Sequence, residues 1–407
     1  MRGLLPKERA EVEITHSSAR GRSFGVARDV LEASPDRVRA PCPHFLACGG
    51  CDLLHLSSPA QRALKRAFVA EALGLPLDRV EPTRAAEPTF GYRALAKLVV
   101  AADRTLGSYR PFSHAVTEMR GCVVHAPIVE QVADQIRGGL AELPPGLIDL
   151  RYVLIRASLT EARAIVTLVV REERSLAARA LAAQLEGSSA VARVVLNVNT
   201  SEGDALLGAG PERSIFDRGA PSERIGAIEQ SLEAGAFAQV NPGAAAILYA
   251  RVVEGLEPRG RRALDLYSGS GGIALSLLSA GAAYVEAIER SREAVEAARR
   301  SAERMGVADR AIFHAAAVEE ALETAAPAEL LVLNPPRRGA APEIIDAIAR
   351  RAPLALAYVS CEPASLARDL QRLGARARLE IESVSPVDLF PHTKHVETVV
   401  IARVGAR

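Results

Sequence analysis

The sequence predicts an α/β protein in which a doubly wound sheet follows an α+β region that carries a cysteine cluster. From about residue 230, short apolar strand patterns alternate regularly with helical patterns, whereas before it strands and helices are mixed without alternation. Three cysteines also fall between residues 42 and 51. At 407 residues, the chain has room for two or three domains of about 100–200 residues each. We expect a short N-terminal segment (1–40), a central α+β domain (41–229) and a C-terminal domain (230–407).

The composition is that of a globular protein, with 49% hydrophobic and 24% charged residues. It excludes a disordered, collagen-like or coiled-coil chain. The longest apolar stretches, such as residues 94–102, have the length of a strand and not the roughly 20 residues of a membrane span. The N-terminus lacks the apolar stretch of a secretory signal. We therefore expect a soluble, cytoplasmic monomer without a membrane partner.

Charge is nearly balanced, with 50 basic and 49 acidic residues, so binding to a nucleic acid requires a local basic patch. All but four of the basic residues are arginine, which together with abundant alanine indicates a GC-rich genome. Residues 1–125 hold 18 basic against 13 acidic residues, and the rest of the chain is net acidic. The N-terminal third is therefore the expected place for such a patch.

The first 230 residues contain irregularly ordered strand and helix patterns. Two short strands are expected near Val12–Ile14 and Phe24–Val30, too little for a stable domain. A helix is expected over 58–73, with Pro59 in its first turn and Leu64, Ala67, Phe68 and Leu73 at helical spacing. Further strands are expected at 95–101, 152–157, 163–170 and 191–198, and helices at 127–140 and 175–185.

The C-terminal part alternates strand and helix. The expected strands are 263–267, 284–288, 310–314, 330–333, 354–359, 379–387 and a last one near 398–402, and the expected helices are 271–278, 292–305, 342–350 and 363–373. Short apolar strands with crossover helices are typical of a doubly wound parallel sheet, which binds ligands at the carboxyl ends of its strands.

The cysteine cluster has the character of a metal site. Cys42, Cys48 and Cys51 lie in a segment rich in proline and glycine, and Cys122 is a possible distant fourth ligand. In a reducing compartment, clustered cysteines more often bind a metal than form disulfides. Four thiolates suit tetrahedral zinc and an iron–sulfur cluster equally. The alternative is that these residues are small buried hydrophobes.

The first strand of the C-terminal sheet runs into a glycine-rich turn (268–272) and then a helix. Such a turn lets a ligand lie against the backbone at the helix N-terminus. Glu289 ends the second strand, where a carboxylate can accept two ribose hydroxyls. Ala274 occupies the third glycine position of a dinucleotide motif, and Asp265 precedes the turn. This pattern favours S-adenosylmethionine, which has no pyrophosphate, over a dinucleotide; the alternative is an ordinary strand–helix turn.

The fourth strand ends in Asn334-Pro335-Pro336-Arg337. The two prolines remove N–H donors and leave carbonyls facing the ligand edge. With an aromatic residue in fourth place, this motif would indicate methylation of an exocyclic amine. Arg337 in that place argues against such a methyltransferase.

Cys361 ends the fifth strand, and Pro363 begins the next helix. A cysteine at the end of an apolar strand is often a packing residue. Here the nearby helix N-terminus is expected to stabilise the thiolate and lower its pKa, which favours a nucleophile.

The last motif places Asp388, His392, His395 and Glu397 within ten residues. It is compatible with a solvated turn, with a metal site on the two histidines, or with a general base. Glu397 stands at the entrance to the last strand, where its carboxylate can face the cleft.

Seven motifs in order closely resemble the RNA (uracil-5-)-methyltransferases over about residues 35–407: PCPHFLACGGCDLLHL, FGYRALAKL, FAQVN, DLYSGSGG, NPPRRG, SCEPASLARDL and DLFPHTKHVETV. The resemblance implies a Rossmann-like class I methyltransferase domain and S-adenosylmethionine as methyl donor. Members that modify rRNA carry a [4Fe-4S] cluster on cysteines spaced as Cys42, Cys48, Cys51 and Cys122 are here; members that modify tRNA generally lack it. By this analogy the central domain binds an iron–sulfur cluster and 23S rRNA is the favoured substrate, with tRNA as the alternative.

The resemblance also implies roles for individual residues. Cys361 would attack C6 of uracil, and Glu397 would remove the C5 proton after methyl transfer. The cofactor-binding positions are Gln239, Tyr267, Gly269, Gly271, Glu289 and Asn334.

The chain departs from the family pattern at several positions. Asn334 stands where the family usually has Asp, although its amide can still pair with uracil. Ser268 replaces a common Cys, and residues 314–317 lack a polar residue found in many relatives. The first 40 residues are shorter than the family's RNA-binding β-barrel and look like its remnant, so RNA binding would fall to residues such as Arg93, Lys97 and Arg120. An RNA-binding pseudoenzyme of the same fold is the alternative, disfavoured because Cys361 and Glu397 are both present.

Overall fold

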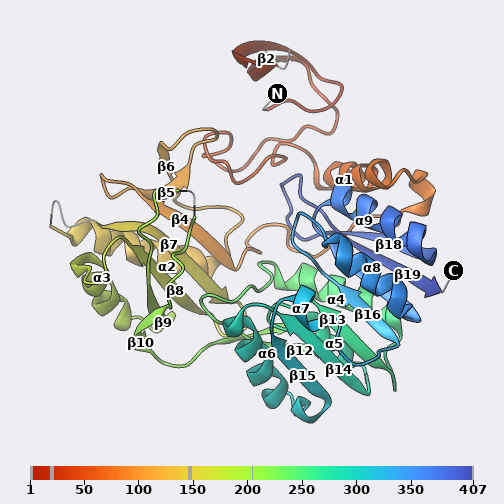
Figure 1. Cartoon of the computed structure of the whole chain (residues 1–407). Coiled ribbons are helices and arrows are strands. Elements are labelled where there is room, and N and C mark those ends of the chain that lie inside the picture. The colour runs from red at the N-terminus through yellow and green to blue at the C-terminus, as the bar shows by residue number, and fades with distance from the viewer. Residues whose placement is uncertain (1–2, 19–22, 145–148, 204, 406–407) are drawn as a thin grey trace.

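The computed structural model describes residues 3–18, 23–144, 149–203 and 205–405, and it is built around two large sheets (Figure 1). One sheet has seven strands and the other eight. None of the helices in these ranges combines the length and apolar content needed to cross a bilayer.

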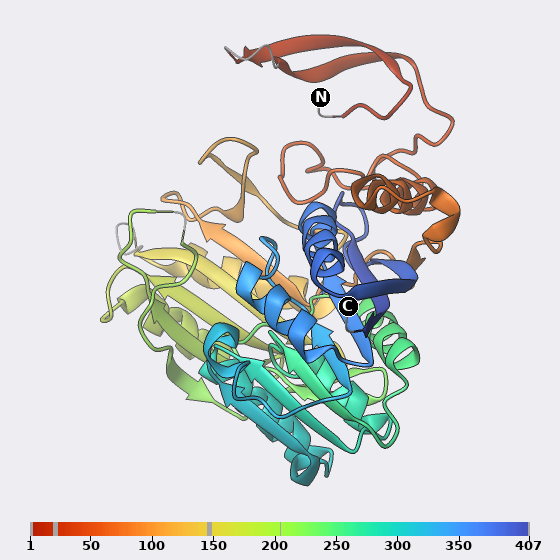
Figure 2. The same cartoon turned by 45° about the vertical axis from the view of Figure 1, so that its right-hand side comes forward.

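The N-terminal segment forms an antiparallel hairpin of β1 (Arg9–Ser17) and β2 (Ser23–Glu32). The hairpin stands apart from both sheets in two views (Figures 1 and 2). It confirms the two expected strands.

Helix α1 (Ser58–Leu73) has the predicted bounds but not the predicted packing face. Ala67 and Phe68 are exposed, whereas Gln61 and Lys65 are buried together with Val69. The helix packs against α9 and β18 of the C-terminal sheet. Gln61 and Lys65 are buried because they bind the end of β18 and the loop that follows it. These polar contacts, and not the spacing of apolar residues, determine which face of the helix is buried.

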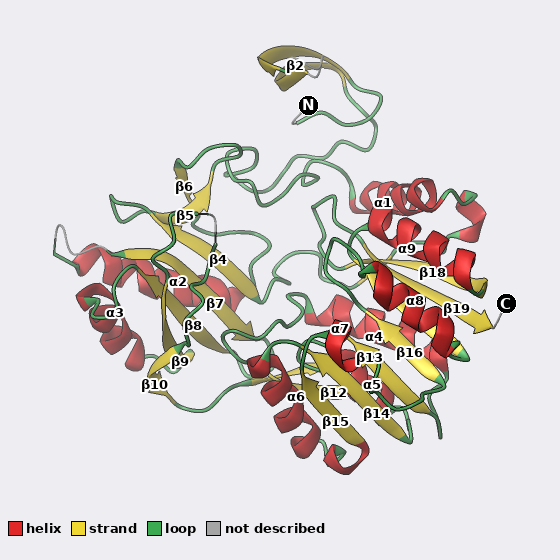
Figure 3. Ribbon diagram, in the orientation of Figure 1, coloured by secondary structure: helices red, strands yellow, loops and turns green. Residues whose placement is uncertain are grey.

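The seven-stranded sheet has the order β10-β9-β8-β7-β4-β5-β6, and only β8 and β9 pair in parallel. Its strands are β4 (Leu95–Val100), β5 (Leu106–Tyr109), β6 (Val116–Glu118), β7 (Leu150–Ser158), β8 (Arg163–Val170), β9 (Val191–Val198) and β10 (Arg213–Asp217). Helices α2 (Pro127–Glu142) and α3 (Leu176–Glu186) cover one face and form the main core with it (Figure 3). This confirms the expected mixture of strands and helices, while β5, β6 and β10 were not predicted.

The eight-stranded sheet has the order β15-β14-β13-β16-β17-β19-β18-β3. Its strands are β13 (Arg262–Leu266), β14 (Tyr284–Glu289), β15 (Ala311–Ala315), β16 (Leu330–Leu333), β17 (Ala355–Ser360), β18 (Arg378–Asp388), β19 (Glu397–Gly405) and β3 (Arg84–Ala85). The five strands from β13 to β17 are parallel, but β19 is antiparallel to both β17 and β18. The expectation of an all-parallel sheet is therefore wrong at this edge, because the last two strands form a hairpin that is inserted beside β17.

Helices cover both faces of this sheet, as a doubly wound fold requires. They are α4 (Pro242–Leu256), α5 (Gly272–Ser279), α6 (Arg292–Arg304), α7 (Val318–Ala321), α8 (Pro342–Arg351) and α9 (Pro363–Arg376). One core packs α4, α5 and α6 on the sheet; the other packs α8, α9 and α1 on the opposite face. Helices α4 and α7, and the small hairpin of β11 (Ser222–Ile225) and β12 (Ile228–Ser231), were not predicted.

Candidate active site and cysteine pocket

The turn after β13 is shaped for a ligand that approaches the backbone. Tyr267, Gly269 and Gly271 all have positive φ angles, of 58°, 55° and 80°. A Cβ atom at Gly271 would lie 2.9 Å from Cβ of Ala298 on α6. Glycine is therefore required there both by the backbone conformation and by the packing of the helix.

Two acidic residues flank this turn. Glu289 accepts hydrogen bonds from the backbone N–H of Gly269 (3.0 Å) and of Ser291 (2.9 Å), which fixes its carboxylate beside the turn. A carboxylate has about four acceptor sites, so Glu289 retains capacity for ribose hydroxyls. Asp265 is fully buried; its Oδ2 accepts from the Ala274 N–H, and burial raises its pKa to about 8.

The same turn contains buried polar atoms without a partner. Oδ1 of Asp265 and Oγ of Ser268 are buried and make no hydrogen bond within the described ranges. The Phe237 ring is 62% exposed and would lie 3.7 Å from a Cβ atom at Gly269. Glycines, unsatisfied polar atoms and an exposed ring together suit the nucleoside part of S-adenosylmethionine. Phe237 was not predicted, although it begins the FAQVN motif that contains Gln239.

Three further predicted cofactor positions lie at this edge or near it. The Tyr267 hydroxyl donates to Glu319 (3.2 Å). The backbone N–H of Asn334 donates to the Leu266 carbonyl, so Asn334 lies next to the end of β13. Gln239 is partly buried beside the linker that leads into α4.

The structure brings Cys361 and Glu397 together. Ser360 of β17 pairs with Thr398 of the antiparallel β19. Cys361 follows Ser360 and Glu397 precedes Thr398, so the two residues stand opposite each other at the sheet edge. Cys361 is partly exposed, whereas Glu397 is 7% exposed. This is the arrangement expected for a nucleophile and a base that act on one ring.

The predicted lowering of the Cys361 pKa is wrong. Burial raises the pKa of the thiol, and the Glu397 charge raises it further; Arg337 opposes both. Burial also raises the pKa of Glu397 to about 8, with Arg337 again acting in the opposite direction.

Arg337 is the functional candidate that the sequence did not reveal. The Arg337 guanidinium lowers the pKa of Cys361, and its charge also lowers that of Glu397. It lies 3.5 Å from Nδ1 of His395, and its carbonyl accepts a hydrogen bond from Ser365 Oγ. The sequence did contain one indication of this role: Arg337 follows the two prolines at the ligand edge, where a cation can pair with an anionic group.

His392 belongs to the framework of the site. Its Nδ1 lies 3.2 Å from the Gln61 amide and its Nε2 lies 3.0 Å from the Thr89 carbonyl. Burial lowers its pKa to about 4. Because both ring nitrogens are engaged and the residue is buried, the hypotheses of a histidine metal site and of a solvated turn are not supported.

Nearby, Lys65 Nζ donates to Asp388 at 2.5 Å and to the Phe390 carbonyl at 3.0 Å, in a buried ion pair. The His392 carbonyl accepts hydrogen bonds from the N–H groups of Asp52 and Leu53, directly after the cysteine loop. The two contacts join the cysteine loop and α1 to the segment between β18 and β19, next to the sheet edge that carries Glu397 and Cys361.

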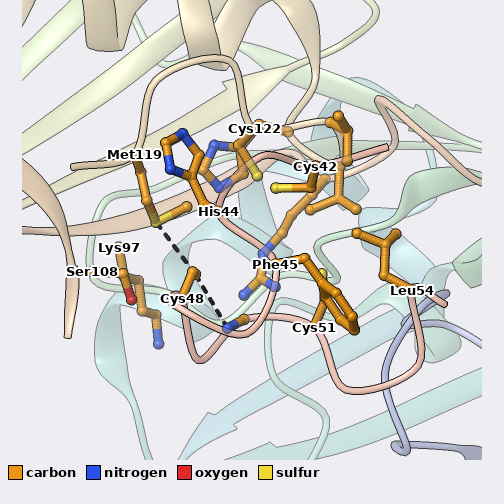
Figure 4. Close-up of a pocket in the computed structure, with 15 residues that line it drawn as sticks. Cys42, His44, Phe45, Cys48, Cys51, Leu54, Lys97, Ser108, Met119 and Cys122 are labelled. Atoms are coloured by element: carbon orange, nitrogen blue, oxygen red, sulfur yellow. Dashed lines mark hydrogen bonds between the residues drawn. The ribbon is translucent and has the colours of Figure 1, made fainter. Parts of the chain in front are cut away.

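The four clustered cysteines line one pocket, which has a volume of about 120 Å³ (Figure 4). Cys42, Cys48 and Cys51 come from one loop and Cys122 from the segment before α2, and none of the four forms a disulfide. The Gly50 N–H donates to Cys48 Sγ at 3.3 Å. Across the described ranges, no group of three or more His, Cys, Asp or Glu side chains is arranged closely enough to hold a metal ion.

The chemistry of the donors nevertheless suits a metal centre. Burial and the neighbouring thiolates raise the pKa of Cys51 to about 12 and also raise that of Cys42. Burial acts likewise on Cys122, but His125, through its side chain and charge, and nearby backbone N–H groups together outweigh it and lower the pKa. Thiols that raise each other's pKa are close enough to repel when ionised, and a shared metal would remove this repulsion.

Cationic residues lie in and near this pocket. Arg93 and Lys97 line the pocket, and Arg156 stands across from Leu95, the first residue of β4. The three charges act on one another: burial lowers the Lys97 pKa, and so do Arg93 and Arg156. The predicted RNA contact Arg120 is exposed and lies 3.7 Å from Glu118.

Comparison with known proteins gives both sequence relatives and a structural neighbour. A family model described as Conserved hypothetical protein 95 matches residues 251–371. The chain is 33% identical to an uncharacterised RNA methyltransferase of Geobacter sulfurreducens, across 98% of this chain and 84% of the relative. An uncharacterised RNA methyltransferase of Halalkalibacterium halodurans is 30% identical, across 98% and 90%.

Among solved structures, the fold is similar to that of the Pyrococcus abyssi tRNA (uracil-54, C5)-methyltransferase in complex with S-adenosyl-L-homocysteine. The TM-score is 0.77 at 24% identity, with 96% of this chain and 91% of that chain covered.

Proposed function

This chain belongs to the RNA methyltransferase family, and we propose that it transfers the methyl group of S-adenosylmethionine to C5 of a uridine in RNA. The observation that carries the proposal is the placement of Cys361 opposite Glu397 at the ligand edge, with Arg337 acting on both. An amine-directed methyltransferase needs no such thiol. A fold kept only for binding RNA needs neither the thiol nor the buried acid.

Uracil C5 is a poor nucleophile until a group adds at C6. The Cys361 thiolate forms a bond to C6, and the electrons of the C5–C6 double bond move toward O4 and make C5 enolate-like. S-adenosylmethionine, when bound beside the glycine turn, supplies an electrophilic methyl group to this carbon. Glu397 then takes the C5 proton, the double bond re-forms, and the C6–S bond breaks to restore the thiolate.

The charges at the edge fit the order of these steps. The thiol must lose its proton before it can add, and Arg337 is the cation that stabilises the resulting thiolate. Glu397 is buried, so its carboxylate is a stronger base than an exposed one. In this proposal Asn334 pairs with the uracil edge, accepting from N3–H and donating to O4.

For the substrate, we propose 23S rRNA, with residues 41–229 as the RNA- and cluster-binding part and 230–407 as the methyl-transfer part. The four cysteines of one pocket favour the rRNA-modifying type by resemblance. The alternative is tRNA, the substrate named for the structural neighbour. The target uridine must leave its stack to reach a partly buried thiol.

We also propose that Cys42, Cys48, Cys51 and Cys122 hold a [4Fe-4S] cluster. The support is the set of four cysteines around one pocket, none in a disulfide, and the effect of neighbouring thiols on the pKa of Cys42 and Cys51. Iron and sulfide analysis of protein purified without oxygen tests this. About four irons per chain and a brown colour that bleaches in air are expected, whereas colourless protein loaded with zinc would contradict the cluster.

The function is tested by mapping 5-methyluridine in rRNA and tRNA from cells with and without this gene. The account predicts one or more 5-methyluridines that disappear from 23S rRNA on deletion. Loss of 5-methyluridine from tRNA alone would show that tRNA, and not 23S rRNA, is the substrate. Methyl groups found on an exocyclic nitrogen would contradict the proposed chemistry.

A further inference from the structure

The seven-stranded sheet carries a second pocket, whose lining includes neither the cysteines nor the residues of the glycine turn. It has a volume of about 250 Å³. The residues that give it its character are Val99, Tyr109, Arg151, Tyr152 and Arg171. Val99 and Tyr152 belong to an apolar cluster distinct from the core under α2 and α3, so the pocket opens on the face that those helices leave uncovered.

The charges of this pocket are all positive. Arg151 and Arg171 are the charged side chains among its described lining residues. Arg151 donates to the carbonyls of Asn199 (3.0 Å) and Ser201 (2.7 Å), which fixes its guanidinium without neutralising it. Arg171 is exposed, and in the described ranges its side chain makes no hydrogen bond or ion pair. One fixed and one available guanidinium favour an anion such as a phosphate.

Aromatic rings accompany these cations. The Tyr109 side chain is 38% exposed, and its hydroxyl lies 3.5 Å from the hydroxyl of Tyr152. The Arg151 guanidinium lies 5.4 Å from the centre of the Tyr152 ring. An exposed ring beside unpaired cations is the pattern that binds single-stranded nucleic acid, in which bases stack on rings and phosphates meet cations.

The pocket is connected to the catalytic edge by residues of the same sheet face. Lys97 precedes Val99 by two positions, and Arg156 follows Tyr152 by four, so both point to the face of the pocket. At the other end of β4, the Ala94 N–H donates to the Val240 carbonyl in the linker that leads into α4. Six residues of strand correspond to roughly 20 Å, which is the distance along β4 between this linker and the pocket.

We propose that this pocket binds a nucleotide of the substrate RNA distant from the methylated base, with the base stacked on Tyr109 and its phosphate held by Arg171 and Arg151. The proposal rests on RNA as the substrate, which the family establishes. It does not require that the methylated atom be C5 of uracil.

The test measures affinity for a fluorescent, mixed-sequence single-stranded RNA by anisotropy at several salt concentrations. We expect Arg171→Glu to weaken binding at least about tenfold and to reduce the salt slope by about one. Tyr109→Leu should weaken binding by roughly tenfold, while Tyr109→Phe, which keeps the ring, stays within about twofold. Thermal melting checks that each variant is folded.

The matched control is Arg179→Glu, the same charge reversal at an exposed arginine of α3 on the opposite side of the sheet. It should change affinity by less than the pocket variants do. Wild-type affinity for Arg171→Glu and Tyr109→Leu, or equal losses in the control, would overturn the proposal. Failure of the proposed chemistry would be read separately, as wild-type protein that binds RNA but forms no 5-methyluridine.

Discussion

The two sulfur sites of this protein differ in how their charge is balanced. At the catalytic edge, Arg337 acts on both Cys361 and Glu397. In the cysteine pocket, Cys42 and Cys51 are raised in pKa by burial and by the neighbouring thiols, and the charge of Arg93 offsets only part of this for Cys51. At the first site, Arg337 can balance the charge of a thiolate at Cys361. In the cysteine pocket the thiols outnumber the cations that could balance their thiolates, and a bound metal would supply the missing positive charge.

This difference fits the two proposed uses of sulfur, as a nucleophile at Cys361 and as a metal ligand in the cysteine pocket. A nucleophile must pass between thiol, adduct and thiolate, so its charge should be only partly stabilised. A structural ligand is held in one state for the life of the protein. The predictions that follow are arranged to separate these two uses.

Replacing Cys361 by Ser should give the largest effect. A hydroxyl in this place is a far weaker nucleophile than a thiolate, and we expect methyl transfer to fall by at least ~10⁴-fold. Transfer of labelled methyl to RNA measures this, and calorimetric binding of S-adenosylmethionine should be unchanged. A variant that still methylates within tenfold of the wild type would remove Cys361 from the chemistry.

The pH dependence should be strong because Glu397 must be a carboxylate to accept the proton. Its pKa is raised to about 8, so the acid is protonated at lower pH, and kcat/KM should fall about tenfold per pH unit below 8. The raised pKa of Cys361 acts in the same direction. Glu397→Gln should lose most of the activity at every pH, and any residual activity should depend on pH only through Cys361. A rate independent of pH from 6 to 9 contradicts the assignment of the base.

Arg337→Ala should have an intermediate effect, roughly tenfold to a hundredfold at pH 7. Without the guanidinium, both Cys361 and Glu397 hold their protons to higher pH, so the rate profile should move toward alkaline pH. Arg337→Lys keeps the charge, so its rate profile should lie closer to that of the wild type than the profile of Arg337→Ala does. An Arg337→Ala profile that is lower but not displaced would show that Arg337 only positions the substrate.

Cys51→Ala should have the smallest effect on the chemical step, within a few-fold at saturating RNA, because the cysteine pocket contributes no group to it. Stability should fall, since loss of a ligand removes the binding energy of the metal from the folded state. Melting temperature and iron content of oxygen-free protein measure this against Cys361→Ser, which should retain both. Unchanged melting and iron content in Cys51→Ala would argue against a metal at this site.

Much of the fold could be predicted because strand and helix signals are local. The bounds of α1 and the parallel strands β13 to β17 follow from the spacing of apolar residues and from prolines at helix starts. The direction of β19 could not be predicted, because a strand pattern carries no sign of which way the strand runs. The buried side of α1 could not be predicted either, because Lys65 is buried in an ion pair with Asp388, which lies more than 300 positions away in the sequence.

The fold brings together Cys361 and Glu397, which the sequence singled out, but the electrostatics of the site could not be predicted. Cys361 and Glu397 follow from their motifs, but the pKa of the thiol depends on how deeply it is buried, which only packing determines. Arg337 lies on a different strand end from His395, and nothing in the sequence shows that the two meet. In the same way, nothing in the sequence shows that Phe237 lies beside the glycine turn.

The central claim is that sulfur of Cys361 adds to the pyrimidine ring, and it is tested most directly by RNA in which the target uridines carry fluorine at C5. Glu397 cannot remove fluorine as it removes a proton, so the adduct should persist after methyl transfer. The account predicts a stable protein–RNA conjugate in the presence of S-adenosylmethionine, attached at Cys361 and absent in Cys361→Ser. An active wild-type enzyme that yields no conjugate, or one attached at another residue, would contradict it.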